Sequence, residues 1–451
     1  MKGKNDLTKG KVSRNIISLT WPMIFGVMGI IIFNLVDTFY VSLLGTDELA
    51  AISFTFPVVL VINSIAIGMG KGTATLVSHA FGMNDYDKTR SIASNALLLS
   101  LLVVVIVAAL GLLFLDPIFN LLNAPPKLHP LIKSYMLIWF PGIIFVVFPM
   151  VGNNIIRALG DSRTPSTVMI IAAITNSILD PLLIFGLGPF PAMGLKGAAL
   201  ATVLSRSITF SIALWILIKR EKLISYKGLK FIKLIRSWMS ILYVGIPNAL
   251  AKMAQPLSAG LITAIMAQFG KEAVAGYGVA AKLEVFALIL VKAIASIMIP
   301  FTGQNLGGNR LDRIKQAIRF VEIISLLSGL LIFLLLFILR FPLASLFSSN
   351  QTVVKTITTY ICLVPPGYLF YGITLNLTAI LNGLKKPLHA SLLHLLQVFA
   401  VMLPLAFLGA RYLSFKGVFL AITVAYITGG IASHFLTNHV LAKIKEASQN
   451  S

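Results

Sequence analysis

Apolar segments long enough to cross a lipid bilayer recur from the beginning of this chain to its end. A helix needs about 20 predominantly apolar residues to cross the hydrocarbon core. Lipid offers no partners for backbone N–H and C=O groups, and the segments are too long and too uniformly apolar for barrel strands. The sequence predicts an all-α polytopic membrane protein with twelve spans, at residues 16–43, 51–79, 92–115, 131–156, 165–186, 194–218, 238–268, 273–303, 317–339, 352–381, 388–409 and 415–441.

The distribution of charge indicates how these spans are oriented. The chain is 12% charged and carries a net charge of +22. The segments on one side of the predicted spans hold about 24 Lys and Arg, and those on the other side about 7. We expect the protein to lie in the plasma membrane. The positive-inside rule then places both termini in the cytoplasm. We assign the positive charge to topology and to contact with membrane lipid, and expect no nucleic acid partner.

Other classes of protein are disfavoured. The single cysteine, Cys362, rules out an intrachain disulfide. The polar, basic segment 1–14 precedes a span too long for a signal sequence, so we expect no cleaved signal. The polar stretches contain no nucleotide-binding loop, GxSxG or paired-carboxylate hydrolase pattern, and the histidines show no metal-ligand spacing. We expect a monomer that is not an enzyme and holds no cofactor.

An internal repeat divides the chain into two halves of six spans. Pro22 in the first half is answered by Pro247 in the second, and Gly45 is answered by Gly270 at the same interval. Other pairs at this interval are Asn84 and Asn309, Tyr135 and Tyr360, and Pro141-Gly142 and Pro366-Gly367, and the interval becomes slightly shorter at Pro181 and Pro404 and again at Lys196-Gly197 and Lys416-Gly417.

An even number of spans returns the chain to the side from which it started, so the halves have the same topology and form parallel repeats. We expect an N-lobe at residues 1–218, a cytoplasmic linker at 219–237 and a C-lobe at 238–451. Transporters with such repeats bind substrate near the interface of the repeats and rock one half against the other.

Asp37 is an ionisable group inside the first span. A carboxylate at this depth costs about 2.5–3.5 kcal/mol on insertion scales, and is by default a candidate for function. The repeat supplies a control, because the counterpart of Asp37 is Ile262. The fold therefore does not need a carboxylate at this position, which favours a functional role.

The fifth span carries a second polar group of the same kind. Asn176 and Asp180 are four residues apart and share one helix face, and their counterparts in the other half are Phe399 and Leu403. Counted from the non-cytoplasmic ends of their spans at 1.5 Å per residue, Asp37, Asp180 and Thr202 all lie about 9–12 Å below the membrane boundary.

Two carboxylates, an amide oxygen and a hydroxyl at one depth suit two tasks. They can coordinate a hard monovalent cation such as Na⁺, or they can share protons, because two close carboxylates in a medium of low dielectric do not both stay ionised. Either task would couple an ion gradient to movement. The alternative is that each carboxylate only hydrogen-bonds a kinked backbone.

The C-lobe has other charges at membrane depth: Lys252, Lys282, Glu284 and Lys292. Lys282 and Glu284 are two residues apart and do not face each other on a helix. We expect a structural ion pair between Glu284 and Lys252 or Lys292. In the N-lobe, Lys71 and Arg206 either pair with the carboxylates or extend toward the membrane surface.

These features together resemble the MATE (multidrug and toxic compound extrusion) family. The resemblance covers essentially the whole chain and rests on the two halves of six spans, Trp21-Pro22, the Phe33–Tyr40 stretch, the Arg157–Asp161 loop and Asn176-xxx-Asp180-Pro181. It implies a secondary antiporter that exports organic, often cationic, drug-like compounds or metabolites in exchange for Na⁺ or H⁺, by rocker-switch alternating access.

The resemblance also implies roles for single residues. The cation site would consist of Asp37, Asn176, Asp180 and Thr202, which would be the metal ligands if the ion is Na⁺. Pro22 would kink the first span. The candidates for the lining of the substrate cavity are Asn34 and Tyr40, which flank Asp37, together with Tyr135, Asn153 and Met169.

One position departs from part of this family. In the NorM-like and eukaryotic branches a carboxylate in the seventh span helps to form a cation site in the C-lobe. Here that position is Gln255, and the tenth span offers Asn376 but no acid. The sequence is therefore most similar to the DinF-like branch, in which coupling resides in the N-lobe.

Two other functions compete with the antiporter. A flippase for lipid-linked saccharides or lipid precursors would use cationic residues to hold phosphate, and Lys71, Arg206, Lys252, Lys282 and Lys292 are candidates. A structural or receptor bundle would have no use for carboxylates that only one half carries.

Overall fold

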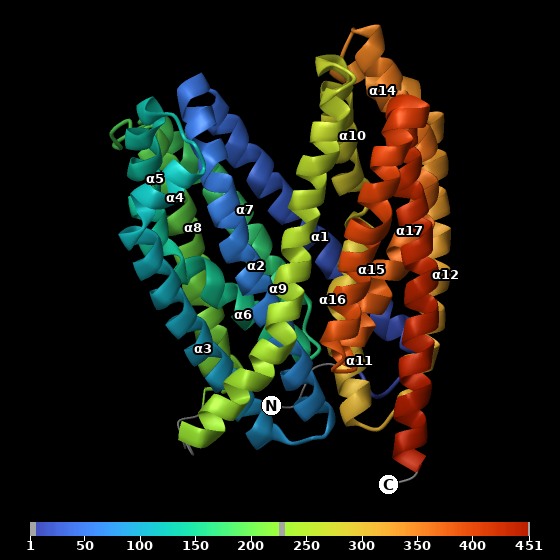
Figure 1. The fold of residues 1–451 in the computed structure, drawn as a ribbon. Coiled ribbons are helices and arrows are strands. Elements are labelled where there is room, and N and C mark those ends of the chain that lie inside the picture. The colour runs from blue at the N-terminus through green and yellow to red at the C-terminus, as the bar shows by residue number, and fades with distance from the viewer. Residues whose placement is uncertain (1–5, 225–230, 450–451) are drawn as a thin grey trace. The chain divides into compact units, whose positions relative to one another are not determined.

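The computed structural model describes residues 6–224 and 231–449, and within these ranges every regular element is a helix (Figure 1). Two compact units are present. Of the described residues, the first unit comprises Asp6, 21–224 and 231–249, and the second comprises 7–20 and 250–449. Helices α1 (Val12–Ser42) and α9 (Phe231–Ala267) each belong partly to both units.

The elements between α1 and α9 belong to the first unit: α2 (Thr46–Gly82), α3 (Tyr86–Leu113), α4 (Leu115–Leu121), η1 (Pro126–Leu128), α5 (His129–Gly142), α6 (Ile144–Ala158), α7 (Arg163–Phe185), α8 (Leu195–Trp215) and the π-helical turn η2 (Ile216–Arg220). The elements after α9 belong to the second unit: α10 (Lys271–Ala287), α11 (Ile289–Gly307), α12 (Leu311–Ile338), α13 (Arg340–Phe347), α14 (Gln351–Leu363), η3 (Pro365–Gly367), α15 (Tyr368–Gly383), α16 (Pro387–Leu395), the π-helical segment η4 (Leu396–Met402) and α17 (Leu403–Gln449).

The helices account for the twelve predicted spans. Among the described residues, 10 helices are long and apolar enough to cross a membrane, and the bent pair of α5 and α6 makes 11. The last of them, residues 387–447, is 61 residues long, about three times what one crossing needs. It contains a non-helical residue, Ser414, and dividing it there supplies the twelfth span.

The repeat seen in the sequence reappears in the backbone. The Pro141-Gly142 pair ends α5, where the axis bends by 42° into α6, and its counterpart Pro366-Gly367 lies in η3, between α14 and α15. Proline removes a backbone donor and clashes with the preceding turn, so the same pair breaks the corresponding span in both halves.

The turns that join the spans also match. Asn84 after α2 and Asn309 after α11 both adopt left-handed backbone conformations, with φ of 60° and 53°. Asparagine tolerates this conformation better than most residues. Gly45 and Gly270, with φ of 148° and 96°, precede α2 and α10, where a residue with a Cβ would be strained.

Each unit has its own apolar core. Trp139, Phe140 and Phe119 lie in the core of the first unit, and Tyr368 and Phe419 lie in that of the second.

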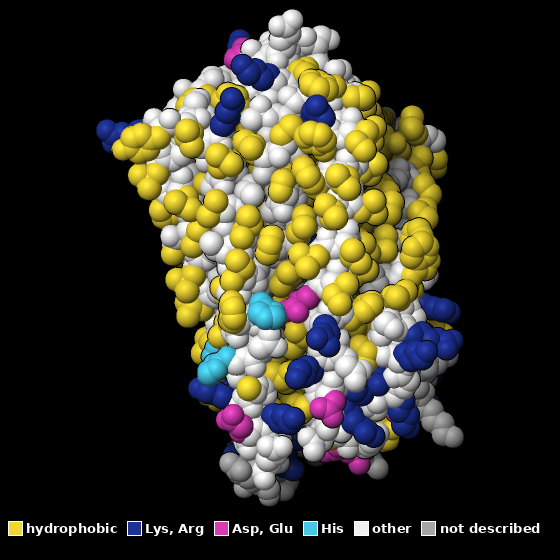
Figure 2. All heavy atoms as spheres, turned by 90° about the vertical axis from the view of Figure 1, so that its right-hand side faces the viewer, with side chains coloured by type: hydrophobic (Ala, Val, Ile, Leu, Met, Phe, Trp, Pro, Cys, Tyr) yellow, Lys and Arg dark blue, Asp and Glu magenta, His cyan; other side chains and the backbone are white. Residues whose placement is uncertain are grey.

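Hydrophobic side chains also cover a broad band of the face in Figure 2, whereas Lys and Arg gather toward one end of it. A polar end beside an apolar band is the surface expected of a membrane protein.

The N-terminal segment is held by the second unit. The Arg313 guanidinium donates hydrogen bonds to the carbonyl oxygens of Leu7 at 3.0 Å, Lys9 at 3.1 Å and Gly10 at 2.6 Å. The Leu7 N–H donates to the Gln304 side chain at 3.1 Å. Helix α1 therefore begins in the second unit and belongs to the first from Trp21 onward, directly before Pro22.

The predicted lobe boundaries stay a prediction. Residues 225–230 of the predicted linker lie outside the described residues, and from Phe231 the linker residues are part of α9.

Candidate functional site

Helix α7 places Asn176 and Asp180 against each other, as their spacing predicts. The Asn176 Nδ2 donates to Asp180 Oδ1 at 3.0 Å, and both side chains are fully buried. This bond leaves one oxygen on each residue, Asn176 Oδ1 and Asp180 Oδ2, buried and without a hydrogen-bond partner among the described residues. Buried polar atoms in native proteins are almost always paired, so these two oxygens need an explanation.

Asp37 on α1 belongs to the same electrostatic cluster. Its charge interacts with that of Asp180 on α7 and with that of Arg206 on α8. Its Oδ1 is a third buried oxygen without a partner among the described residues. Tyr135 on α5 is buried and interacts electrostatically with both carboxylates.

Asn153 on α6 has another oxygen of this kind. Its side chain is buried, and its Oδ1 has no partner in the part of the chain that the structure describes. Thr202 on α8 is also buried, and its carbonyl accepts a hydrogen bond from the Ser205 hydroxyl at 2.9 Å. Hard cations prefer oxygen ligands, so carboxylate and amide oxygens of this kind suit Na⁺ as well as a proton.

The remaining predicted cavity residues differ from one another in exposure and in packing. Asn34 is exposed on α1, whereas Tyr40 is half-buried and its ring packs edge-on against Phe185 with centroids 6.2 Å apart. Tyr135 is part of the apolar core of the first unit. Met169 on α7 is half-buried and lies beside Gly26 of α1, where an added Cβ would be 3.1 Å from its sulfur.

For Arg206, the sequence left open whether the side chain pairs with the carboxylates or extends toward the membrane surface. Its guanidinium lies 4.5 Å from the centre of the Phe33 ring, and its Nε is buried without a partner among the described residues. Its charge interacts with that of Asp37, but the described residues show no ion pair between the two. Lys71 takes a different partner, since its Nζ donates to Asn248 Oδ1 at 3.1 Å.

The predicted ion pair of Glu284 is wrong. Within the described ranges no ion pair joins Glu284 to Lys252 or Lys292, and its carboxylate accepts hydrogen bonds from the hydroxyls of Tyr360, Tyr368 and Tyr426. Lys252 instead donates to Gln255 Oε1 at 2.7 Å. The prediction failed because the tyrosines come from α14, α15 and α17, which are far away in the sequence.

Lys282 is exposed and Lys292 is half-buried. Among the described residues, no group of three or more His, Cys, Asp or Glu side chains could hold a metal ion. This does not bear on a site that includes amide and hydroxyl oxygens.

The two halves of the sequence match one family profile separately. The MatE profile matches residues 22–182 and again residues 247–408. The two matches begin at Pro22 and Pro247, the pair of prolines that sets the interval of the internal repeat. The chain belongs to the MatE family.

The relatives of this MatE protein include transporters of more than one kind. It is 36% identical over 451 residues to a protein of Shewanella oneidensis named "FAD transporter", with 100% of both chains covered. It is 26% identical to the "Probable multidrug resistance protein YoeA" of Bacillus subtilis, with 85% of this chain and 84% of the relative covered. It is 23% identical to the "Multidrug export protein MepA" of Staphylococcus aureus, with 92% and 91% covered.

Solved structures agree with the fold. The MATE transporter VcmN of Vibrio cholerae in its bent form aligns with a TM-score of 0.90 at 28% identity, over 96% of this chain and 97% of that one. The outward-facing conformation of a multidrug resistance MATE transporter aligns with a TM-score of 0.92 at 23% identity, over 99% of both chains. This MatE protein is therefore a multi-pass, all-α membrane protein with two pseudo-symmetric six-helix halves.

Proposed function

We propose that this protein is a secondary antiporter that exports small organic compounds in exchange for Na⁺ or H⁺. The observation that carries the proposal is that three members of the predicted cation site, Asp37, Asn176 and Asp180, each have a buried oxygen without a partner among the described residues. Two of the three are carboxylates that interact with each other. A bound cation or proton would be the partner that these oxygens lack, and its binding would change the charge of the cluster.

The way in which α1 is shared supports alternating access by a rocking motion. Residues up to Thr20 belong to the second unit, and residues from Trp21 belong to the first. Pro22 lies directly beyond this boundary, and a proline inside a helix weakens the hydrogen bonding of the preceding turn. A bend at Pro22 that follows the charge state of Asp37 would act on both units at once.

The test is efflux from vesicles that contain the purified protein and a fluorescent substrate. An Na⁺ gradient and a pH gradient are imposed in turn, and at least one of them should accelerate efflux. The proposal fails if efflux is indifferent to both. Binding of Na⁺ measured across pH, in the wild type and in Asp37→Asn, then tells which ion occupies the cluster.

A flavin dinucleotide is the substrate that the relatives favour. The protein named as an FAD transporter is 36% identical to this chain over its full length, whereas the multidrug relatives described above are 23–26% identical. FAD is fluorescent, so the same vesicles can be loaded with it. A cationic dye loaded in parallel separates the flavin candidate from export of drug-like cations.

A flippase for lipid-linked saccharides or lipid precursors is the alternative. It would use the intramembrane cations, of which Arg206 lies over the Phe33 ring and Lys71 is bonded to Asn248. Lys252, Lys282 and Lys292 remain candidates for holding phosphate, so the preference for the antiporter rests on the buried oxygens of the first unit. Translocation of a fluorescent phospholipid in empty vesicles, independent of any ion gradient, would favour the flippase.

We also propose that the protein is monomeric, lies in the plasma membrane and has both termini in the cytoplasm.

A further inference from the structure

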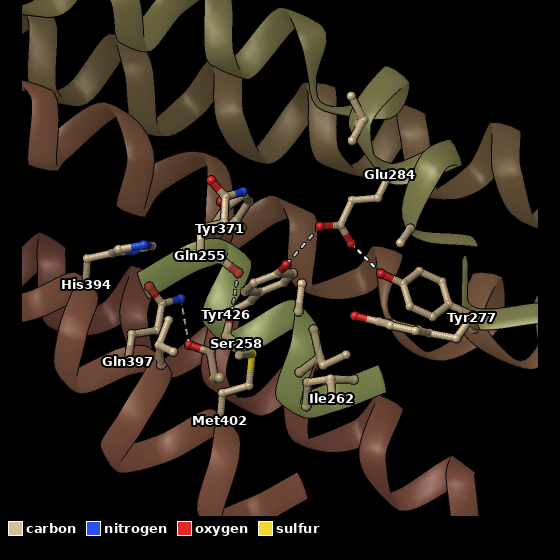
Figure 3. Close-up of a pocket in the computed structure, with 17 residues that line it drawn as sticks. Gln255, Ser258, Ile262, Tyr277, Glu284, Tyr371, His394, Gln397, Met402 and Tyr426 are labelled. Atoms are coloured by element: carbon tan, nitrogen blue, oxygen red, sulfur yellow. Dashed lines mark hydrogen bonds between the residues drawn. The ribbon is translucent and has the colours of Figure 1, made fainter. Parts of the chain in front are cut away.

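The second unit contains a pocket that the predicted cation cluster does not use. It has a volume of about 200 Å³ and is lined by residues from α9, α10, α14, α15, α16, η4 and α17 (Figure 3). Ala259, Ile262 and Tyr360 line it. The interval of the internal repeat makes these three the counterparts of Asn34, Asp37 and Tyr135 in the first unit, so the pocket occupies the place that the cation cluster occupies in the other half.

The polar groups of this pocket differ from those of the cation cluster in the first unit. Glu284 accepts hydrogen bonds from the Tyr368 hydroxyl at 3.1 Å, from the Tyr426 hydroxyl at 3.0 Å and from the Tyr360 hydroxyl. Its oxygens are therefore supplied with donors. The carboxylate fixes the orientation of the phenol rings, and we assign it a positioning role.

Aromatic faces form much of the pocket. The rings of Tyr371 and Tyr426 are stacked, with centroids 4.3 Å apart and an interplanar angle of 26°. The rings of Tyr277 and Tyr360 also lie close together, with centroids 6.2 Å apart. Flat rings suit a flat aromatic ligand, and those of Tyr360 and Tyr426 are held by hydrogen bonds to Glu284, so that stacking costs little conformational entropy.

Gln397 presents an unsatisfied acceptor at this pocket. Its Nε2 donates to the Ala425 carbonyl at 3.0 Å, and because a carbonyl only accepts, the amide oxygen must face the other way. This Oε1 is buried and has no hydrogen-bond partner among the described residues, and the side chain is 5% exposed. A ligand with an N–H group would satisfy it.

The backbone around Gln397 is built to hold it there. Gln397 is the second residue of the π-helical segment η4, and π-helical turns are frequent at functional sites. On the facing helix, a Cβ at Gly429 would lie 2.5 Å from Gln397 Nε2, so only glycine leaves room for this side chain.

Positive charge lies beside the pocket. Gln255 lines the pocket and accepts the hydrogen bond from Lys252, which is exposed. The Lys252 ammonium group opposes a cationic ligand at this place and favours an anionic group, such as a phosphate, next to the ring.

We propose that this pocket receives the nitrogen heterocycle of a phosphate-bearing substrate. A ring N–H donates to Gln397 Oε1, the ring face stacks on the tyrosines, and the phosphate is held by Lys252. The pocket has room for one fused ring system, and the rest of the substrate lies outside it. The inference rests on the proposed export of a flavin dinucleotide and assigns the part of the protein that recognises it.

The test is equilibrium binding to the full-length protein in detergent, without any gradient. FAD, FMN and riboflavin are titrated and their fluorescence is followed. Gln397→Leu should weaken binding of all three by about tenfold or more, because a site built around a hydrogen bond loses strongly when one partner is removed. Lys252→Gln should weaken FAD and FMN but not riboflavin, which has no phosphate. The control is Gln316→Leu, at an exposed position of α12, which should bind like the wild type.

A second variant covers the case in which Gln397→Leu does not fold. Ala259→Phe fills the pocket from an exposed position of α9 and should also abolish binding. The pocket assignment is overturned if FAD binds equally well to folded Gln397→Leu or Ala259→Phe. It is also overturned if the pocket takes a cationic dye and Lys252→Gln strengthens that binding.

The outcomes separate this inference from the proposed function. If the wild type exports a cationic dye under an ion gradient but neither binds nor exports FAD, the antiporter stands and the pocket assignment falls. If FAD binding depends on Gln397 while no gradient drives efflux, the antiporter falls and the pocket stands.

Discussion

Two carboxylates on different helices, the half-buried Asp37 and the buried Asp180, are the residues on which ion coupling is proposed to depend. Removing either charge leaves the cluster unable to hold a cation or to exchange a proton. We expect Asp37→Asn and Asp180→Asn each to lower gradient-driven efflux by about tenfold or more, since intramembrane carboxylates of this kind carry coupling. Initial rates of efflux from loaded vesicles measure the effect.

The matched control for this prediction is Asp116→Asn. Asp116 is an exposed carboxylate, bonded to Lys133 at 3.2 Å, and its loss should leave efflux unchanged. Full coupled transport in both Asp37→Asn and Asp180→Asn would remove these residues from the proposed site.

Asp161, in the connection between α6 and α7, predicts a pH dependence. Partial burial opposes its ionisation, but hydrogen bonds from Thr164 and Arg220 outweigh this and hold the pKa of Asp161 below its usual value. A carboxyl with a lowered folded-state pKa stabilises the fold above its unfolded pKa of about 4 and loses that contribution as the pH falls through the folded pKa.

We therefore expect Asp161→Asn to be less stable than the wild type at pH 7, by up to about 1 kcal/mol, and equally stable near the acid end. Thermal unfolding followed at several pH values measures the difference. A gap between the two proteins that stays constant down to about pH 3 would contradict the pKa assignment.

At the scale of elements, the break at Ser414 turns α17 into two crossings that pack closely. Ser414 has φ of 57°, and the backbones of Gly409 and Gly417 on either side of it meet. A Cβ at Gly409 would lie 2.5 Å from the Gly417 carbonyl carbon. We expect Gly409→Ala to cost about 1–3 kcal/mol, as overpacking usually does, which thermal unfolding in detergent would measure.

Gly260 is the matched control, because a Cβ there would have no atom within 4 Å. Gly260→Ala should raise the stability by up to about 1 kcal/mol, because alanine is the better helix former. An unfolding temperature of Gly409→Ala equal to that of the wild type would show that close packing of Gly409 against Gly417 does not contribute to stability.

At the scale of the whole molecule, the asymmetry of Lys and Arg predicts which connections face the cytoplasm. Cys362 is the only cysteine, so Cys362→Ser gives a background for labelling. In intact cells a membrane-impermeant maleimide should label Ser349→Cys, in the exposed connection between α13 and α14. Asp87→Cys, whose native side chain is 99% exposed, should react only after the cells are permeabilised. The reverse pattern would place both termini outside.

The sequence predicted the fold to a large extent because two of its signals are long-range by nature. Twelve apolar segments and an internal repeat at a nearly constant interval define two similar halves without any knowledge of packing, and the family profile matches at the same interval. The pairing of Asn176 with Asp180 followed from their spacing on one helix. Glu284 could not be understood in this way, because its tyrosine partners are 76, 84 and 142 residues away.

The residues of the second pocket carry only weak signals in the sequence. Gln397 is a single polar residue in an apolar segment, and nothing local shows that its amide nitrogen is bonded to Ala425 while its oxygen has no partner among the described residues. Tyr360 was part of the repeat, but its role depends on which carboxylate it meets.

By itself, the sequence determined that the chain is a membrane protein of two repeated halves and that only one half carries Asp37 and Asp180, because lipid restricts the backbone to helices and the repeat exposes what differs. Only the tertiary structure decided which buried atoms lack a partner and which side chains from distant helices surround them. Hydrogen bonding depends on positions within a few tenths of an ångström, and these are set by the packing of whole helices.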